Sequence, residues 1–154
     1  MMPGMDGFEV CKKLREDEET AHIPVVMVTA LSEKEDRIKG LEVGADDFLT
    51  KPVNDNALFA RVKSLVRLKV MIDELRLRGE TGVQFGVESS GEGLGLADAR
   101  IMVIDDDAVQ SRQLTDRLSL VNKNIDIEPN PDSALDKAVN GNYDVIIIST
   151  QMID

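Results

Sequence analysis

The chain has 154 residues, of which 42% are hydrophobic and only 3% aromatic, and its formal net charge is −11 at pH 7. This length allows one domain or two incomplete ones, and the acidic charge argues against nucleic-acid and anionic membrane partners. The single cysteine, Cys11, excludes an internal disulfide framework and favours a reducing compartment. No apolar run is long enough to span a membrane, so we expect a soluble cytoplasmic protein.

Residues 1–78 begin with a loop and continue as alternating helices and strands. Apolar residues at helical spacing predict an amphipathic helix over residues 7–18. The apolar run at residues 25–28 predicts a buried parallel strand that ends at Thr29 and Ala30. A second helix opens where Ser32 and Glu35 are spaced as a capping box. The residues of this helix expected to face the interior are Ile38, Leu41 and Val43.

The longest predicted element is a helix that follows a short strand at residues 48–50. It is capped by Asn54 or Asp55 and runs without a helix breaker to about Arg78. Its second half has apolar residues at 3-4-3 spacing, which predicts packing against another helix or a dimer contact. A free-standing amphipathic tail is the alternative. These seam residues are Leu65, Leu68, Ile72 and Leu75.

Residues 79–99 are rich in Gly, Ser and Glu, which predicts a flexible linker. After the linker, strands and helices alternate again, which is typical of a parallel α/β sheet with right-handed crossovers. The expected elements are a strand at 100–104, a helix at 107–121, a strand at 125–128, a helix at 131–140 and a strand at 145–148. In the helix at 107–121, the side chains expected to face inward are Val109, Leu114, Leu118 and Val121.

Three consecutive carboxylates, Asp105 to Asp107, follow the buried run of Ile101 to Ile104. Adjacent carboxylates repel each other, so a metal ion or a lysine is expected nearby. Parallel sheets bind ligands at the carboxyl ends of their strands, where these acids should lie. The alternative is that Asp107 caps the next helix while Asp105 and Asp106 are solvated loop acids.

Several segments together resemble the bacterial response-regulator receiver domain. The second half of a receiver is resembled by three segments of this chain, MMPGMDGFEV, VVMVTA and GADDFLTKP. The segment VIDDD resembles the first strand of a receiver, and YDVIIISTQMID resembles its third strand. The resemblance implies a flavodoxin-like, doubly wound five-stranded parallel sheet with the family strand order 2-1-3-4-5. In this chain that order corresponds to 125–128, 100–104, 145–148, 25–28 and 48–50.

The long helix and Gly-rich linker further resemble PleD-type regulators, which have two receivers in tandem before a diguanylate cyclase domain. On this resemblance, residues 1–78 are the C-terminal half of the first receiver. Residues 79–99 are the linker, and residues 100–154 are the N-terminal half of a degenerate second receiver. We therefore expect one circularly permuted hybrid receiver, assembled within one chain or by swapping halves between two chains. The cyclase signature GGDEF is absent from this chain, so no enzyme activity is expected.

The resemblance also implies the roles of individual residues. Ser149 stands at the phosphoacceptor position, where the family has Asp, so the chain should not accept a phosphoryl group. A weak Mg²⁺ site would use Asp105, Asp106 and the main-chain carbonyl of Gln151, or of Met1 at the equivalent place in the other half. The residues expected to contact a phosphoryl group or to switch with it are Thr29, Ala30, Phe48 and Lys51.

The expected function is therefore a two-component phosphorelay module, with a histidine kinase as partner of the full-length protein and a homodimer or swapped dimer as its assembly. Two alternatives stay open. A strand that ends in paired Asp residues also occurs in Mg²⁺-dependent phosphatases of the haloacid-dehalogenase type. A structural dimerisation adaptor acting through the seam residues is the other.

Overall fold

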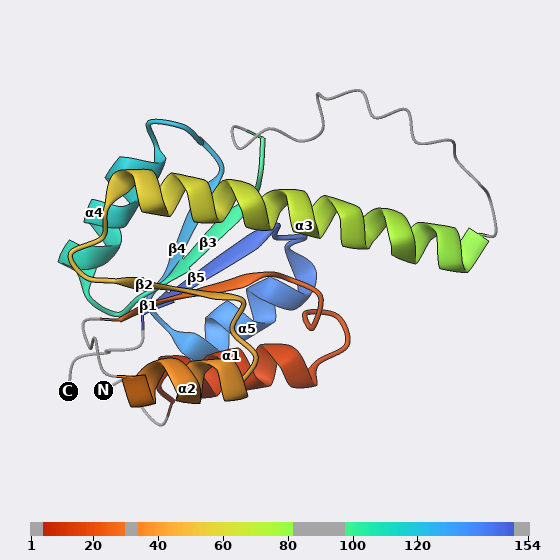
Figure 1. Cartoon of the computed structure of the whole chain (residues 1–154), viewed down its shortest axis with the longest axis horizontal. Helices are drawn as coiled ribbons and strands as arrows, with labels where there is room; N and C mark the ends of the chain where they lie inside the picture. Colours follow the sequence, from red (N-terminus) through yellow and green to blue (C-terminus); the bar gives the residue numbers. More distant parts are fainter. Residues whose placement is uncertain (1–4, 30–33, 82–97, 150–154) are drawn as a thin grey trace.

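The computed structural model describes residues 5–29, 34–81 and 98–149, in which a parallel sheet lies between two layers of helices (Figure 1). The strands are β1 (Val25–Thr29), β2 (Asp47–Thr50), β3 (Ile101–Ile104), β4 (Ile125–Glu128) and β5 (Val145–Ser149). The helices are α1 (Gly7–Glu16), α2 (Lys34–Glu42), α3 (Asp55–Thr81), α4 (Ala108–Leu118) and α5 (Pro131–Asn140).

The sheet has the order β2-β1-β5-β3-β4, and every neighbouring pair is parallel. This is the order predicted from the family resemblance, read from the opposite edge, and it confirms the α/β fold. Strand β5 pairs with β1 on one side and with β3 on the other. The segments before and after residues 82–97 therefore share one continuous sheet within a single chain.

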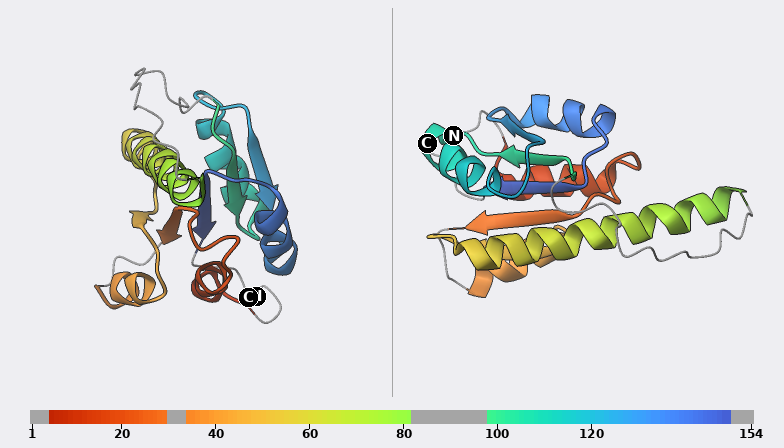
Figure 2. Two further views of the ribbon diagram at one scale, coloured as in Figure 1. Left: turned by 90° about the vertical axis from the view of Figure 1, so that its right-hand side faces the viewer. Right: turned by 90° about the horizontal axis from the view of Figure 1, so that it is seen from above.

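The central strands are apolar throughout because both faces of the sheet are covered, and alternate side chains point to opposite faces. Helices α1 and α5 cover one face, while α3 and α4 cover the other (Figure 2). The α1/α5 side buries Met27, Met102, Ile104, Ile146 and Ile148 of the strands. The α3/α4 side buries Val26, Val28, Ile101, Val103, Val145 and Ile147.

The helix termini follow local capping chemistry. Helix α1 begins at a complete capping box formed by Asp6 and Glu9, and it ends at Glu16 because Asp17 adopts an extended backbone. Its predicted end at residue 18 was therefore two residues too late. Helix α3 begins where the Oδ1 atom of Asn54 accepts a hydrogen bond from the Ala57 N–H at 3.1 Å, and it continues to Thr81.

Some side chains predicted to face inward are exposed. Ile38 and Leu41 of α2 lie at the surface, because α2 turns Gly40 toward the domain and the Phe48 ring occupies the space beside it. Val109 of α4 is also exposed, and Ser111 takes the buried position. A periodic pattern shows that a helix has an apolar side but does not identify which side meets the sheet.

The seam of α3 is only partly available to a partner. Leu65 is buried in the α3/α4 side of the core, whereas Leu68 and Leu75 are 41% and 64% exposed. Met71, which the 3-4-3 pattern did not include, is 61% exposed on the same helix. Helix α3 extends beyond the sheet (Figure 1), and no helix among the described residues is long and apolar enough to cross a membrane.

Candidate functional site

The predicted site residues meet at the carboxyl ends of the strands. Thr29 ends β1, Ser149 ends β5, Asp105 directly follows β3 and Lys51 directly follows β2. Thr29, Asp105 and Ser149 are almost fully buried. The cluster is composite, because Thr29 and Lys51 precede residues 82–97 while Asp105 and Ser149 follow them.

Lys51 is the residue that joins the two parts of the site. Its Nζ atom donates to the Ser149 Oγ atom at 3.1 Å and also to the Oε1 atom of Gln110 on α4. Its backbone N–H donates to the Thr29 carbonyl oxygen at 2.8 Å, which holds the residue after β2 against the end of β1. The ammonium group is therefore positioned beside the Ser149 hydroxyl at the end of β5.

The three carboxylates have different environments. Asp107 caps α4: its Oδ1 atom accepts from the N–H groups of Val109 at 2.8 Å and Gln110 at 3.2 Å. The N–H groups of Gln110 and Val109 lower the pKa of Asp107. This part of the alternative interpretation is correct. Asp105 is not a solvated loop acid, because only 1% of its surface is exposed.

Burial raises the pKa of Asp105, and the charges of Asp106 and Asp107 act in the same direction. The Asp107 N–H, which donates to the Asp105 Oδ1 atom at 2.9 Å, and the Lys51 charge oppose this shift without cancelling it. The other oxygen of Asp105, Oδ2, is buried without a hydrogen-bond partner among the described residues, as is Oδ1 of Asp106. Two neighbouring carboxylates therefore each have an oxygen that no donor within residues 5–29, 34–81 and 98–149 satisfies.

These two oxygens fit a hard cation such as Mg²⁺, which prefers oxygen ligands and retains several waters. Within the described residues, however, no group of three or more acids, histidines or cysteines could hold a metal ion. Ser149 supplies a neutral hydroxyl where a third carboxylate would strengthen binding. The donor set is thus suited to Mg²⁺ but incomplete in charge.

The remaining predicted site residues divide into two groups. Phe48 is partly buried and packs against the α1/α5 side of the core, so its ring has a structural contact whether or not it also switches. Ala30, Gln151 and Met1 lie outside the described residues, as does the capping residue Ser32.

Sequence reasoning missed two polar residues of α4. Gln110 contacts Lys51, and Arg117 donates from Nη1 to the Val53 carbonyl oxygen at 2.6 Å. Both contacts join residues about sixty positions apart in the chain, and no local pattern indicates them. Gln110 and Arg117 also line a cavity of about 370 Å³ beside Lys51.

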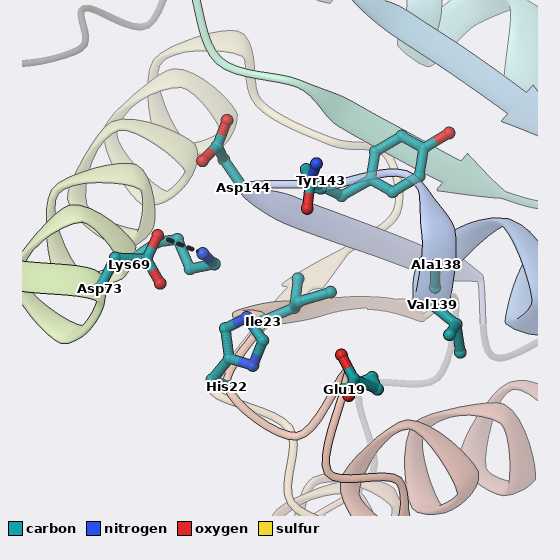
Figure 3. Close-up of a pocket in the computed structure, with 10 residues that line it drawn as sticks. Glu19, His22, Ile23, Lys69, Asp73, Ala138, Val139, Tyr143 and Asp144 are labelled. Atoms are coloured by element: carbon teal, nitrogen blue, oxygen red, sulfur yellow. Dashed lines mark hydrogen bonds and ion pairs between the residues drawn. The ribbon is translucent and has the colours of Figure 1, made fainter. Parts of the chain in front are cut away.

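A larger cavity of about 480 Å³ lies at the opposite, amino end of the sheet (Figure 3). Its lining includes Ile23 just before β1, Asp144 just before β5, and the buried Lys69 of α3, which pairs with Asp73. None of the predicted site residues lines this cavity. It is therefore separate from the carboxylate cluster.

Comparison with known proteins agrees with this geometry. The family model of the response regulator receiver domain matches residues 1–63. The response regulator PleD of Caulobacter vibrioides (strain NA1000 / CB15N) is 46% identical over 153 residues, which is 97% of this chain and 33% of PleD. The similarity to PleD thus continues well past the segment that the family model matches.

Shorter similarities involve other regulators. RpaA of Synechocystis sp., named as a DNA-binding dual master transcriptional regulator, is 54% identical over 67 residues, 44% of this chain and 28% of RpaA. The phosphate regulon regulatory protein PhoB of Pseudomonas aeruginosa is 48% identical over 67 residues, 44% of this chain and 29% of PhoB. The chain spans about a third of the length of these relatives. Residues 1–63 thus belong to the response-regulator receiver family, and the chain, with its five-stranded parallel sheet, is similar to PleD over 97% of its length.

Proposed function

We propose that the chain is receiver material of a two-component response regulator whose hybrid pocket binds Mg²⁺ weakly and accepts no phosphoryl group. The observation that carries this proposal is Ser149: it lies at the end of β5, 3.1 Å from the Lys51 Nζ atom, where a phosphoacceptor carboxylate would stand. A hydroxyl beside an ammonium group lacks the general base that would make it a nucleophile. Lys51 instead balances the buried charge of Asp105.

The division into a C-terminal half of one receiver (residues 1–78) and an N-terminal half of a degenerate second (residues 100–154) is part of this proposal. It is supported by the family match to residues 1–63 and by the similarity to PleD across nearly the whole chain. We further propose that the chain belongs to a longer, cytoplasmic protein, with a histidine kinase as the phosphodonor partner and a diguanylate cyclase domain as the output. The degenerate receiver would then act as an adaptor.

The pocket chemistry can be tested with a small phosphodonor. After incubation with acetyl phosphate and Mg²⁺, the intact mass of the chain should stay unchanged, because Ser149 is the only side chain at the acceptor position. A stoichiometric gain of one phosphoryl group on this chain would contradict the proposal. A receiver with an acceptor Asp, treated in parallel, shows that the donor is active.

A role in dimerisation is the second candidate function, and the exposed side chains of α3 favour it. Leu68, Met71 and Leu75 recur along one side of the helix and are 41%, 61% and 64% exposed. Burying each of these side chains against a second copy would stabilise a dimer by about 1 kcal/mol or more. We propose that two α3 helices pair through this side.

The paired-helix proposal predicts that Leu68→Glu combined with Leu75→Glu lowers the solution mass from two chains to one. Light scattering at several concentrations measures this, and Leu120→Glu, at a position that is 76% exposed, is the control. A monomeric wild type, or a double variant that stays dimeric, would exclude the pairing.

The phosphatase alternative has less support, because the Asp107 carboxylate accepts hydrogen bonds as the cap of α4.

A further inference from the structure

Residues 5–81 and residues 98–149 share both the sheet and the hydrophobic core of the domain. Strand β5 of the second segment forms a parallel ladder with β1 of the first, from Val25 paired with Ile146 to Val28 paired with Ser149. Every residue of β1 and of β5 is buried. Both sides of the core contain residues of both segments. Neither segment can therefore bury its own apolar strands alone.

Polar contacts outside the sheet reinforce the same surface. The Arg117 Nη1 atom donates to the Val53 carbonyl oxygen at 2.6 Å, and Arg117 Nε lies 3.3 Å from Asp55 Oδ1. The Ile146 N–H donates to the Pro24 carbonyl oxygen at 2.9 Å. Each of these contacts could form equally well if residues 98–149 came from another copy of the chain.

We propose that the two segments are exchangeable between copies, so that a second copy of this chain can supply residues 98–149 to the first. Each pocket of an exchanged pair then combines Lys51 and Thr29 of one chain with Asp105, Asp106 and Ser149 of the other. The second copy thus contributes residues to the site, because residues 5–81 alone lack the Ser149 side chain that Lys51 contacts.

Protein concentration decides which arrangement is populated. The two segments are separated by residues 82–97, and a chain of this length spans at most about 55 Å. Because the two segments are covalently joined, each meets its own complement at an effective concentration on the order of 1 mM, so the closed single chain dominates in dilute solution. Exchange becomes favoured when the chain's own complementary segment is defective, because the intramolecular competitor is then removed.

Two full-length variants with complementary defects test the proposal. Val26 of β1 and Ile147 of β5 are register partners and fully buried, so Val26→Asp and Ile147→Asp should each prevent folding. Refolded together at about 0.1 mM, the two chains should form one intact domain from the undamaged segments. We expect up to half of the wild-type far-UV circular dichroism signal and amide protection, in a particle with the mass of one copy of each chain.

The control variant Leu120→Asp, at an exposed position, should refold alone under the same conditions. A mixture that recovers no structure where wild type refolds fully would overturn the proposal. Pairing of α3 helices cannot produce the recovery, because it joins chains that are each folded on their own, and recovery should persist when both chains also have Leu68→Glu. The readout involves no metal or phosphoryl group, so it is independent of the proposed function.

Discussion

Replacing Ser149 with Asp should give the pocket a side chain that accepts a phosphoryl group. The new carboxylate would stand beside the Lys51 ammonium group, which now contacts the Ser149 hydroxyl at 3.1 Å. It would also add a third negative charge to the unsatisfied oxygens of Asp105 and Asp106. Incubated with acetyl phosphate and Mg²⁺, Ser149→Asp should gain one phosphoryl group per chain, whereas wild type gains none.

The same substitution should increase Mg²⁺ affinity on the order of tenfold or more, because a charge close to the metal contributes a few kcal/mol in a partly buried site. Isothermal titration calorimetry measures the affinity. Ser149→Asn has nearly the same shape as Ser149→Asp without the charge, so it should behave like wild type in both assays. A folded Ser149→Asp protein with unchanged Mg²⁺ affinity would show that residues 105 and 106 do not form a metal site.

Truncating a buried side chain of the central strand β5 should produce the largest loss of stability. Ile147 of β5 is fully buried between β1 and β3 on the side covered by α3 and α4. Ile147→Ala removes three heavy atoms from this close-packed region, so the free energy of unfolding should fall by about 3–4 kcal/mol. Guanidinium chloride unfolding followed by far-UV circular dichroism measures the change.

Ile127→Ala is the matched control, because the same side chain is 40% exposed on the edge strand β4 and its truncation should cost less than about 1 kcal/mol. Both variants should unfold in a single transition, since β5 joins the two segments of the chain in one sheet. Two separate transitions, or equal losses of stability for the two variants, would contradict this description of the core.

The central strands β1, β3 and β5 were predictable because their sequences are apolar at nearly every position, a pattern that arises when both faces of a parallel sheet are covered. The order of the strands came from the resemblance of short segments to receivers, not from their periodicity. Helix faces were less predictable. Ile38 and Leu41 are apolar yet exposed, because burial of α2 depends on the close approach of the Phe48 ring to Gly40.

Within the site, the acids were visible in the sequence as a run of like charges that requires compensation. The sequence pattern also offered Asp107 as the cap of the next helix, but it left the burial of Asp105 open. Asp107 caps α4 through the neighbouring N–H groups, while Asp105 is buried and retains an unsatisfied oxygen. This difference arises because Asp107 directly precedes α4, whereas Asp105 directly follows the buried strand β3.

By itself, the sequence of this protein determined the alternation of strands and helices, the placement of acids after β3 and the Ser at the end of β5. These features depend on residues that are close together in the chain. Only the tertiary structure decided that Lys51 contacts Gln110 and Ser149, and that Arg117 contacts the Val53 carbonyl oxygen. Such contacts join distant segments, and they form because neither segment can bury its apolar strands without the other.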